Sequence, residues 1–225
     1  MRASFYSGAS IQNRRTTNMD SLLIKERAVL SRNVLLAAVC DGVGGLEDGA
    51  FASAYAARAL NKWIDEITDA KRLGLRMRDK ILEIDREIIS QAKAEGLQTA
   101  STLSALLLVQ SKFYIVHTGD SRIYNWTRQG LKQLTIDQSQ GGKLTACLGH
   151  PGYQSLTYNE GLCSGQNFLL CSDGLYKRMN MDYLYEKLME CNQKNIQNTI
   201  KQLIQFVVER GETDNISVAL IMFEN

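Results

Sequence analysis

This chain has a single proline, almost balanced charge and no long apolar run. Pro151 is the single proline among 225 residues, and no proline-rich or low-complexity tract marks a linker between domains. Lys and Arg total 26 against 24 Asp and Glu, so a net charge of +2 offers no basic field for nucleic-acid binding. No apolar run reaches the roughly 18 residues of a membrane span or resembles a signal peptide. We expect one soluble, cytoplasmic domain over residues 1–225 that binds no nucleic acid.

Cysteine and histidine patterns that bind soft metals are also missing. The five cysteines are odd in number and show no Cys-x-x-Cys spacing, which favours buried thiols in a reducing compartment. Of the two histidines, we expect His117 to be a hydrogen-bonded strand residue and His150 to lie in a loop. A metal site in this chain would therefore use oxygen ligands, which favours Mg²⁺ or Mn²⁺ over Zn²⁺ or Cu²⁺.

Strand-like and helix-like segments alternate along the chain. Short runs rich in β-branched and aromatic residues predict strands at 33–40, 102–109, 113–118, 122–126, 167–171 and 216–223. Apolar residues at helical spacing predict amphipathic helices at 50–68, 77–95, 181–191 and 196–209. This order predicts an α+β fold in which helices pack outside mostly antiparallel sheets. The glycine-rich segment 138–165 is expected to be a loop-rich connection.

Three aspartates stand at the ends of strand-like runs. Asp41 and Asp173 each follow an apolar run and precede a glycine, and Asp214 opens the last predicted strand. Taken singly, each is a common turn residue. Carboxylates that converge in one cleft would repel and raise one another's pKa unless a cation neutralised them. Together the three residues predict a site for a hard divalent metal ion.

A larger ordered set of residues carries a family resemblance. The set is Arg15-x-x-Asn18-x-Asp20, Asp41-Gly42-x-Gly44-Gly45, Thr102-Leu103, Gly119-Asp120-Ser121-Arg122, Leu134-Thr135-x-Asp137-x-Ser139, Ser172-Asp173-Gly174-Leu175 and Asp214-Asn215-x-Ser217-Val218. In this order the motifs resemble the metal-dependent type 2C (PPM) protein serine/threonine phosphatases of the bacterial type. The resemblance implies a β-sandwich of two antiparallel sheets flanked by helix pairs on both sides, with a two-metal site at one end.

The resemblance also implies the ligands of two Mn²⁺ or Mg²⁺ ions. Asp41 would bridge both ions, the Gly42 carbonyl would bind the first, and Asp173 with Asp214 would bind the second. Two such ions can clamp both sides of an in-line attack on a phosphomonoester. A water that bridges them would be the nucleophile, because metal coordination lowers the pKa of water.

Two further residues take catalytic roles in this resemblance. Asp20 would lie beside the metals and hydrogen-bond metal-bound water, and Arg15 would hold the substrate phosphate through its planar fork of donors. The implied activity is hydrolysis of phosphoserine and phosphothreonine in proteins. The implied partners are a phosphorylated protein substrate and the bacterial Ser/Thr kinase that the enzyme opposes.

The chain departs from the family pattern at three positions near these residues. Met19 stands where the family usually has an acidic residue that holds a metal through water, so one metal would bind more loosely. Val43 stands where many eukaryotic members have His and bacterial members commonly have an apolar residue. Lys177 lies where a second carboxylate for a third ion is often found, so Asp120 would be at most a weak ligand of a third ion.

The segment after Ser139 is short for this family. Gln140-Gly141-Gly142 leads almost at once to residues 143–149, which predicts a shortened flap and an open cleft with altered selectivity. An open cleft would also admit small phosphorylated metabolites. Together with Met19, the short segment would suit a catalytically impaired phosphatase that only binds phosphoproteins, whereas the intact aspartates argue for an enzyme.

Overall fold

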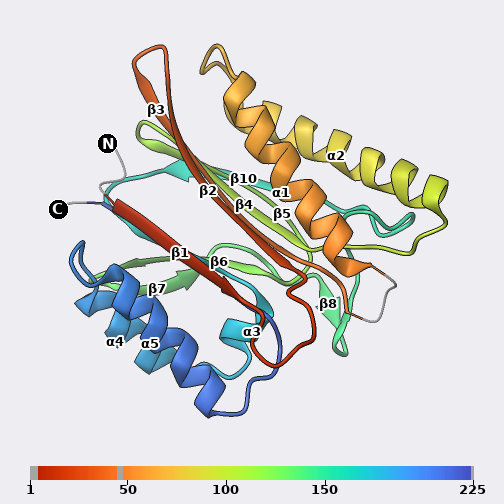
Figure 1. The fold of residues 1–225 in the computed structure, drawn as a ribbon. Coiled ribbons are helices and arrows are strands. Elements are labelled where there is room, and N and C mark those ends of the chain that lie inside the picture. The colour runs from red at the N-terminus through yellow and green to blue at the C-terminus, as the bar shows by residue number, and fades with distance from the viewer. Residues whose placement is uncertain (1–4, 45–47, 224–225) are drawn as a thin grey trace.

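Two five-stranded antiparallel sheets form the centre of the structure, a computed structural model that describes residues 5–44 and 48–223 (Figure 1). The first sheet has the order β1 (Phe5–Ile11), β12 (Ile216–Met222), β11 (Asn167–Cys171), β6 (Arg122–Thr127) and β7 (Gly130–Gln133). The second sheet has the order β10 (Thr157–Leu162), β5 (Lys112–Thr118), β4 (Leu103–Val109), β3 (Arg32–Asp41) and β2 (Asp20–Val29). A separate hairpin pairs β8 (Ser139–Gln140) with β9 (Lys143–Leu144).

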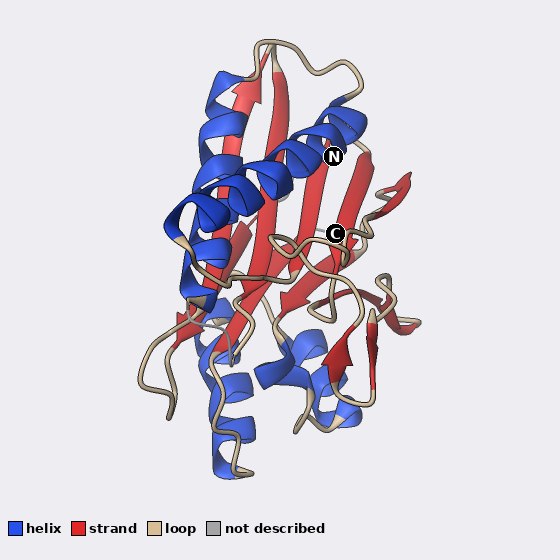
Figure 2. Ribbon diagram, turned by 90° about the vertical axis from the view of Figure 1, so that its right-hand side faces the viewer, coloured by secondary structure: helices blue, strands red, loops and turns tan. Residues whose placement is uncertain are grey.

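Helices cover the outer face of each sheet. The second sheet carries α1 (Gly49–Glu66) and α2 (Leu73–Glu95), and the first carries α4 (Met181–Glu190) and α5 (Ile196–Glu209) (Figures 1 and 2). The four-residue helix α3 (Asp173–Tyr176) follows β11. Among the residues that the structure describes, no helix has the length and apolar character needed to cross a membrane.

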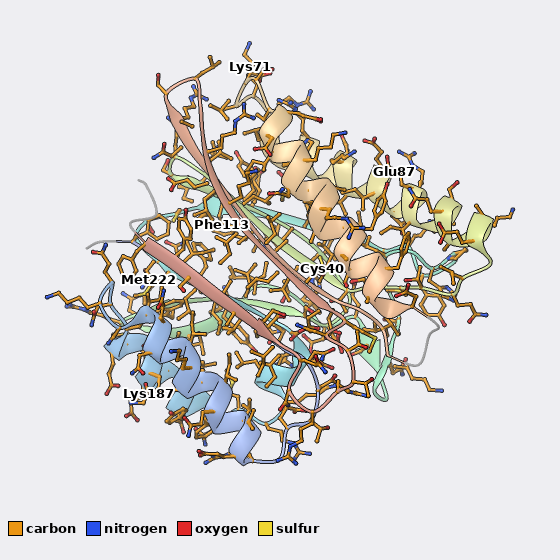
Figure 3. The ribbon with its side chains drawn as sticks, viewed as in Figure 1. Cys40, Lys71, Glu87, Phe113, Lys187 and Met222 are labelled. Carbon is orange, nitrogen blue, oxygen red and sulfur yellow. The ribbon has the colours of Figure 1, made fainter. Side chains whose placement is uncertain are left out.

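Three apolar clusters hold these layers together. One lies between α1, α2 and the second sheet, another lies between α4, α5 and the first sheet, and the third fills the space between the sheets. Phe113 belongs to the third cluster, whereas the labelled charged residue Lys71 lies on the exposed outside (Figure 3). Burying three apolar interfaces of this kind supplies most of the free energy that stabilises such a fold.

The predicted fold class is confirmed: it is an α+β sandwich of antiparallel sheets flanked by helix pairs. All six predicted strands and all four predicted helices are present, and α2 begins at Leu73, four residues earlier than predicted. The sequence did not indicate β1, β2, β7, β10 or the β8–β9 hairpin. β1, β2, β7 and β10 lie at sheet edges, where one side of the backbone is unpaired and most side chains are partly or fully exposed, so no continuous apolar run marks them.

Candidate functional site

A pocket of about 550 Å³ lies at the end of the sandwich where the predicted motif residues meet. Six of the seven residues to which the sequence gave a site role line this pocket: Arg15, Asp41, Gly42, Asp120, Asp173 and Asp214. The seventh, Asp20, is only 7% exposed and lies behind the pocket wall. The sequence therefore identified residues that the fold brings together from five separate segments of the chain.

Asp20 and Asp41 are direct partners across the β2–β3 strand pair. The Ser172 hydroxyl donates to Asp20 Oδ2 over 2.8 Å, whereas the buried Asp20 Oδ1 has no hydrogen-bond partner. Burial raises the pKa of Asp20 to about 6, and the charges of Asp173 and Asp214 add to the rise, whereas the nearby hydroxyls of Ser217 and Ser172 oppose it. The pKa of Asp41 lies well above its ordinary value because of burial and then the charge of Asp20.

The turn after β3 is tightly fixed around Gly42. The Asp41 backbone N–H donates to Thr102 Oγ1 over 3.0 Å, and the Gly42 N–H donates to the Met19 carbonyl over 3.1 Å. A Cβ added at Gly42 would stand 2.4 Å from the carbonyl oxygen of Gly49, so only glycine fits here. Gly45, the last residue of this motif, lies outside the described residues.

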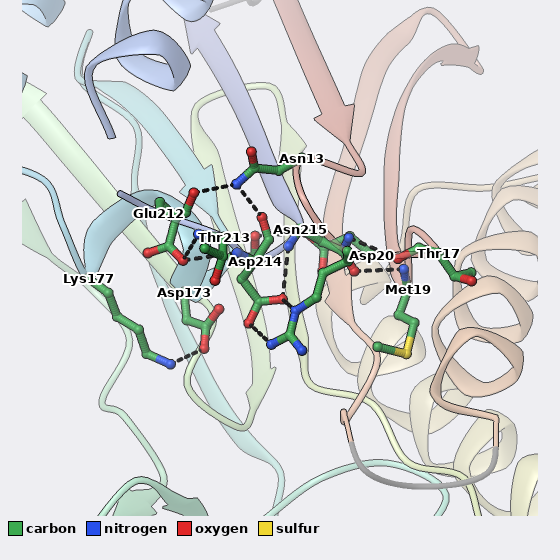
Figure 4. A network of polar contacts seen from close by, with 12 residues as sticks. Asn13, Thr17, Met19, Asp20, Asp173, Lys177, Glu212, Thr213, Asp214 and Asn215 are labelled. Carbon is green, nitrogen blue, oxygen red and sulfur yellow. Dashed lines mark hydrogen bonds and ion pairs between the residues drawn. The ribbon is translucent and has the colours of Figure 1, made fainter. Parts of the chain in front are cut away.

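Asp214 is held from both its backbone and its carboxylate (Figure 4). Glu212 Oε1 accepts from the Asp214 backbone N–H over 3.0 Å, and Asn13 Nδ2 donates to the Asp214 carbonyl, also over 3.0 Å. Arg15 donates through Nε and Nη2 to the two Asp214 carboxylate oxygens, over 2.9 and 2.8 Å. The guanidinium that was predicted to hold phosphate thus lies in the pocket and pairs with a predicted metal ligand. Its role toward phosphate stays a prediction.

Lys177 forms an ion pair with Asp173 and acts electrostatically on Asp120. Asp173 begins α3, and Lys177, one helical turn later, forms an ion pair with its Oδ2 (Figure 4). Burial and the charge of Asp173 raise the pKa of Asp120 to about 6, and the Lys177 ammonium opposes that rise. Lys177 is therefore close enough to act electrostatically on both carboxylates.

The donor chemistry of the pocket fits hard divalent ions. Burial and the charges of neighbouring carboxylates raise the pKa of Asp20 and of Asp41, and the buried Asp20 Oδ1 has no partner. A nearby cation would relieve this environment. As they stand, no three or more His, Cys, Asp or Glu side chains among the described residues form a group that could enclose one ion. The carboxylates of Asp214 and Asp173 are instead engaged in ion pairs with Arg15 and Lys177. Metal binding would need these two carboxylates to turn.

Comparison with known proteins identifies the family. A family model described as protein phosphatase 2C matches residues 7–210. This chain belongs to the protein phosphatase 2C family. The serine/threonine phosphatase stp of Listeria monocytogenes is 29% identical over 81% of this chain and 82% of its own length. A putative protein phosphatase of Mycoplasma genitalium is 26% identical over 85% of each chain.

Solved structures agree with this assignment. The crystal structure of the serine/threonine phosphatase Stp1 from Staphylococcus aureus matches with a TM-score of 0.88 over 98% of this chain and 95% of that one. The two sequences are 21% identical, so this match establishes a shared fold. The catalytic domain of PstP in complex with two manganese ions matches with a TM-score of 0.82 at 25% identity, over 97% of each chain. The predicted family, bacterial type and enzyme class, a protein serine/threonine phosphatase, are confirmed.

The glycine-rich segment contributes one wall of the pocket, which the sequence did not indicate. Gly141 and Gly142, with φ of 59° and 77°, form the two-residue turn of the β8–β9 hairpin, and Lys143 follows at the pocket. His150 and Tyr153 also line it, with ring centroids 4.8 Å apart in an edge-on contact. His150 does lie in a loop, as expected, but it faces the site. The short hairpin agrees with the shortened segment, and the open cleft stays a prediction.

Other expectations concern residues that support the fold. His117 is fully buried, with Nδ1 bonded to Ser104 Oγ and Nε2 to the Ile136 carbonyl, as expected of a hydrogen-bonded strand residue. The cysteines are all free and buried, as predicted: Cys40, Cys147, Cys163, Cys171 and Cys191. Burial raises the pKa of the Cys147 thiol to about 11, so that thiol is inert although it lines the pocket.

Proposed function

We propose that residues 1–225 form one catalytic domain that removes phosphate from phosphoserine and phosphothreonine of proteins with the help of two Mn²⁺ or Mg²⁺ ions. The observation that carries the proposal is the convergence of four carboxylates, from Asp20, Asp41, Asp173 and Asp214, at one pocket. Their mutual repulsion and burial make the pocket a poor place for free carboxylates and a good place for cations. The two manganese ions of the related PstP catalytic domain support the metal and its number.

The protein groups have distinct tasks in this proposal. Asp41 and the Gly42 carbonyl would hold the first ion, and Asp41, Asp173 and Asp214 would hold the second. When bound, the ions would neutralise phosphate oxygens and lower the pKa of water so that it can attack phosphorus in line. Asp20 Oδ1 is buried and has no partner, so it would accept a hydrogen bond from the attacking water after the side chain turns toward the pocket.

Arg15 and Val43 act on the substrate side. Arg15 is half exposed and lies in the pocket. Its planar guanidinium could donate to two phosphate oxygens once a metal ion, in place of Arg15, binds the Asp214 carboxylate. Val43 lines the pocket without a group that could protonate the departing serine or threonine alkoxide. Solvent at the pocket is therefore the proposed source of that proton.

We place the substrate proteins, and the Ser/Thr kinase that phosphorylates them, in the cytoplasm. The five buried free cysteines are typical of a reducing compartment. Two relatives, from Listeria monocytogenes and Mycobacterium tuberculosis, are named serine/threonine phosphatases, which supports a phosphoprotein substrate. Met19 would suit a binding module without activity, whereas the intact carboxylates of the pocket favour an enzyme.

The proposal is tested by the hydrolysis of a phosphothreonine peptide and an aryl phosphate. Asp41→Asn should lower kcat/KM more than about 100-fold with Mn²⁺, because it removes the proposed bridging carboxylate. Asp79→Asn is the matched control, since the Asp79 side chain is 61% exposed on α2 and away from the pocket. A chelator should abolish turnover by the wild-type protein. Turnover that survives both the chelator and Asp41→Asn would exclude the two-metal mechanism, and a preference for small esters over the peptide would exclude protein substrates.

A further inference from the structure

Lys177 is a cation of the pocket that belongs to none of the motifs shared with the family. It follows α3 directly, and the helical turn places its ammonium against Asp173 Oδ2. The two side chains differ in exposure, with 55% for Lys177 and 15% for Asp173. A flexible ammonium thus reaches from solvent to a carboxylate that is mostly buried, and it lines the same pocket (Figure 4).

The same ammonium acts on a second carboxylate, in the turn between β5 and β6. Asp120 lines the pocket, and the charge of Lys177 works against the burial and the Asp173 charge that raise the pKa of Asp120. The carboxylates of Asp120 and Asp41 in turn favour the charged form of Lys177. Lys177 therefore forms an ion pair with Asp173 and lies within electrostatic reach of Asp120 and Asp41.

We propose that Lys177 is a positioning residue that supplies a built-in positive charge next to Asp173, in the pocket that Asp120 also lines, and thereby weakens metal binding there. The proposal rests on the metal-dependent function proposed above. The ammonium competes for a carboxylate oxygen that the second ion would use, and it repels a divalent ion placed next to it. At a separation of about 5 Å in a solvent-like medium, this repulsion corresponds to roughly a tenfold change in affinity.

Manganese binding measures this effect directly, without reference to turnover. In isothermal titration calorimetry, Lys177→Met should bind its weaker Mn²⁺ ion about tenfold more tightly than the wild-type protein. Lys177→Arg keeps the charge and should retain the wild-type affinity. Lys62→Met is the matched control, because Lys62 also pairs with a carboxylate four residues away, Glu66, but on the exposed face of α1.

A double substitution locates the effect. If Lys177 offsets the charge of Asp120, Asp120→Asn should lower Mn²⁺ affinity by a larger factor in the Lys177→Met variant than in the wild-type protein. Circular dichroism and thermal unfolding in chelator establish that each variant folds. Wild-type protein that binds two Mn²⁺ ions while Lys177→Met shows unchanged affinity would overturn this inference alone. Wild-type protein that binds no Mn²⁺ would overturn the proposed metal-dependent function, and this inference with it.

Discussion

Replacing Asp20 by Asn should make the metal-free protein more stable while it impairs catalysis. The Asp20 carboxylate is 7% exposed, receives one side-chain hydrogen bond from Ser172, and has an unpartnered Oδ1. Burial in the first place, and the charges of Asp173 and Asp214 in addition, make its ionised form unfavourable. Asn has nearly the same shape and carries no charge, so it removes the electrostatic cost and keeps an oxygen for the Ser172 hydroxyl.

The size of the effect follows from the pKa. Folding raises the pKa of Asp20 from 3.8 to about 6, so the folded protein favours the protonated carboxyl. The stability that this protonated group contributes is fully present below pH 3.8, and it is lost as the pH rises through about 6. The loss amounts to about 3 kcal/mol, because a change of one in pKa corresponds to about 1.4 kcal/mol. The Asn Nδ2 would occupy the unpartnered position, which costs about 1–2 kcal/mol. The net gain for Asp20→Asn at pH 7.5 is therefore about 1–2 kcal/mol.

Urea unfolding in the presence of a chelator measures this gain. The stability advantage of Asp20→Asn over the wild-type protein, measured as the difference in unfolding free energy, should grow between pH 4 and pH 6.5. Above pH 6.5 this difference should stay constant. Asp120, whose pKa is also raised to about 6, is present in both proteins, so its contribution largely cancels in the difference. With Mn²⁺ added, the wild-type protein should gain more stability than the variant, and kcat should fall in the variant. A variant that is less stable in chelator at pH 7.5, or a difference that does not change with pH, would refute the reasoning.

Two further substitutions test the turn after β3 and the residue next to Asp20. Gly42→Ala should lower the unfolding free energy by about 2–4 kcal/mol, because its Cβ would meet backbone atoms of Gly49 and Met19, which cannot move aside. Gly44→Ala is the control, since its nearest neighbour is a side-chain carbon of Met19 at 4.0 Å, and equal losses for both would contradict the steric argument. Met19→Glu should tighten Mn²⁺ binding about tenfold in calorimetry, because Met19 lines the pocket and a carboxylate adds an oxygen ligand. Unchanged affinity would show that this side chain does not reach the ions.

The buried strands were predictable from the sequence because each is buried on both faces. β3, β4, β11 and β12 are almost continuous apolar runs, and that pattern follows from their position between a helix layer and the other sheet. β2 lies at a sheet edge and carries Lys25, Glu26 and Arg27 in its centre, so its pattern resembles that of an exposed segment. β2 can be recognised as a strand only from its pairing with β3, and the local sequence pattern does not reveal that pairing.

The carboxylates of the site were predictable by residue type, whereas the groups that hold them were not. Ser172 donates to Asp20, and its hydroxyl also accepts from the Ser217 backbone N–H over 2.9 Å. Asn215 accepts from the Met19 N–H over 2.9 Å and donates to the carbonyls of two residues in the N-terminal loop. Both residues stand in the recognised motifs, but their roles arise from contacts between segments about 200 or about 150 residues apart, and spacing along the chain does not reveal such contacts.

The charge of the pocket connects the ligands to the substrate. Five aspartates surround it, at positions 20, 41, 120, 173 and 214, and three cationic side chains line it: Arg15, Lys143 and Lys177. When all are ionised, the excess of two negative charges would repel a phosphomonoester, which is itself a dianion. Two divalent ions reverse this excess to two positive charges, which match the dianion. The same ions favour ionised carboxylates, so that Arg15 no longer needs to neutralise Asp214 and its donors are available to phosphate. The pocket should therefore bind phosphate only when metal ions are bound, and Arg15 without the ions should not be enough for phosphate binding.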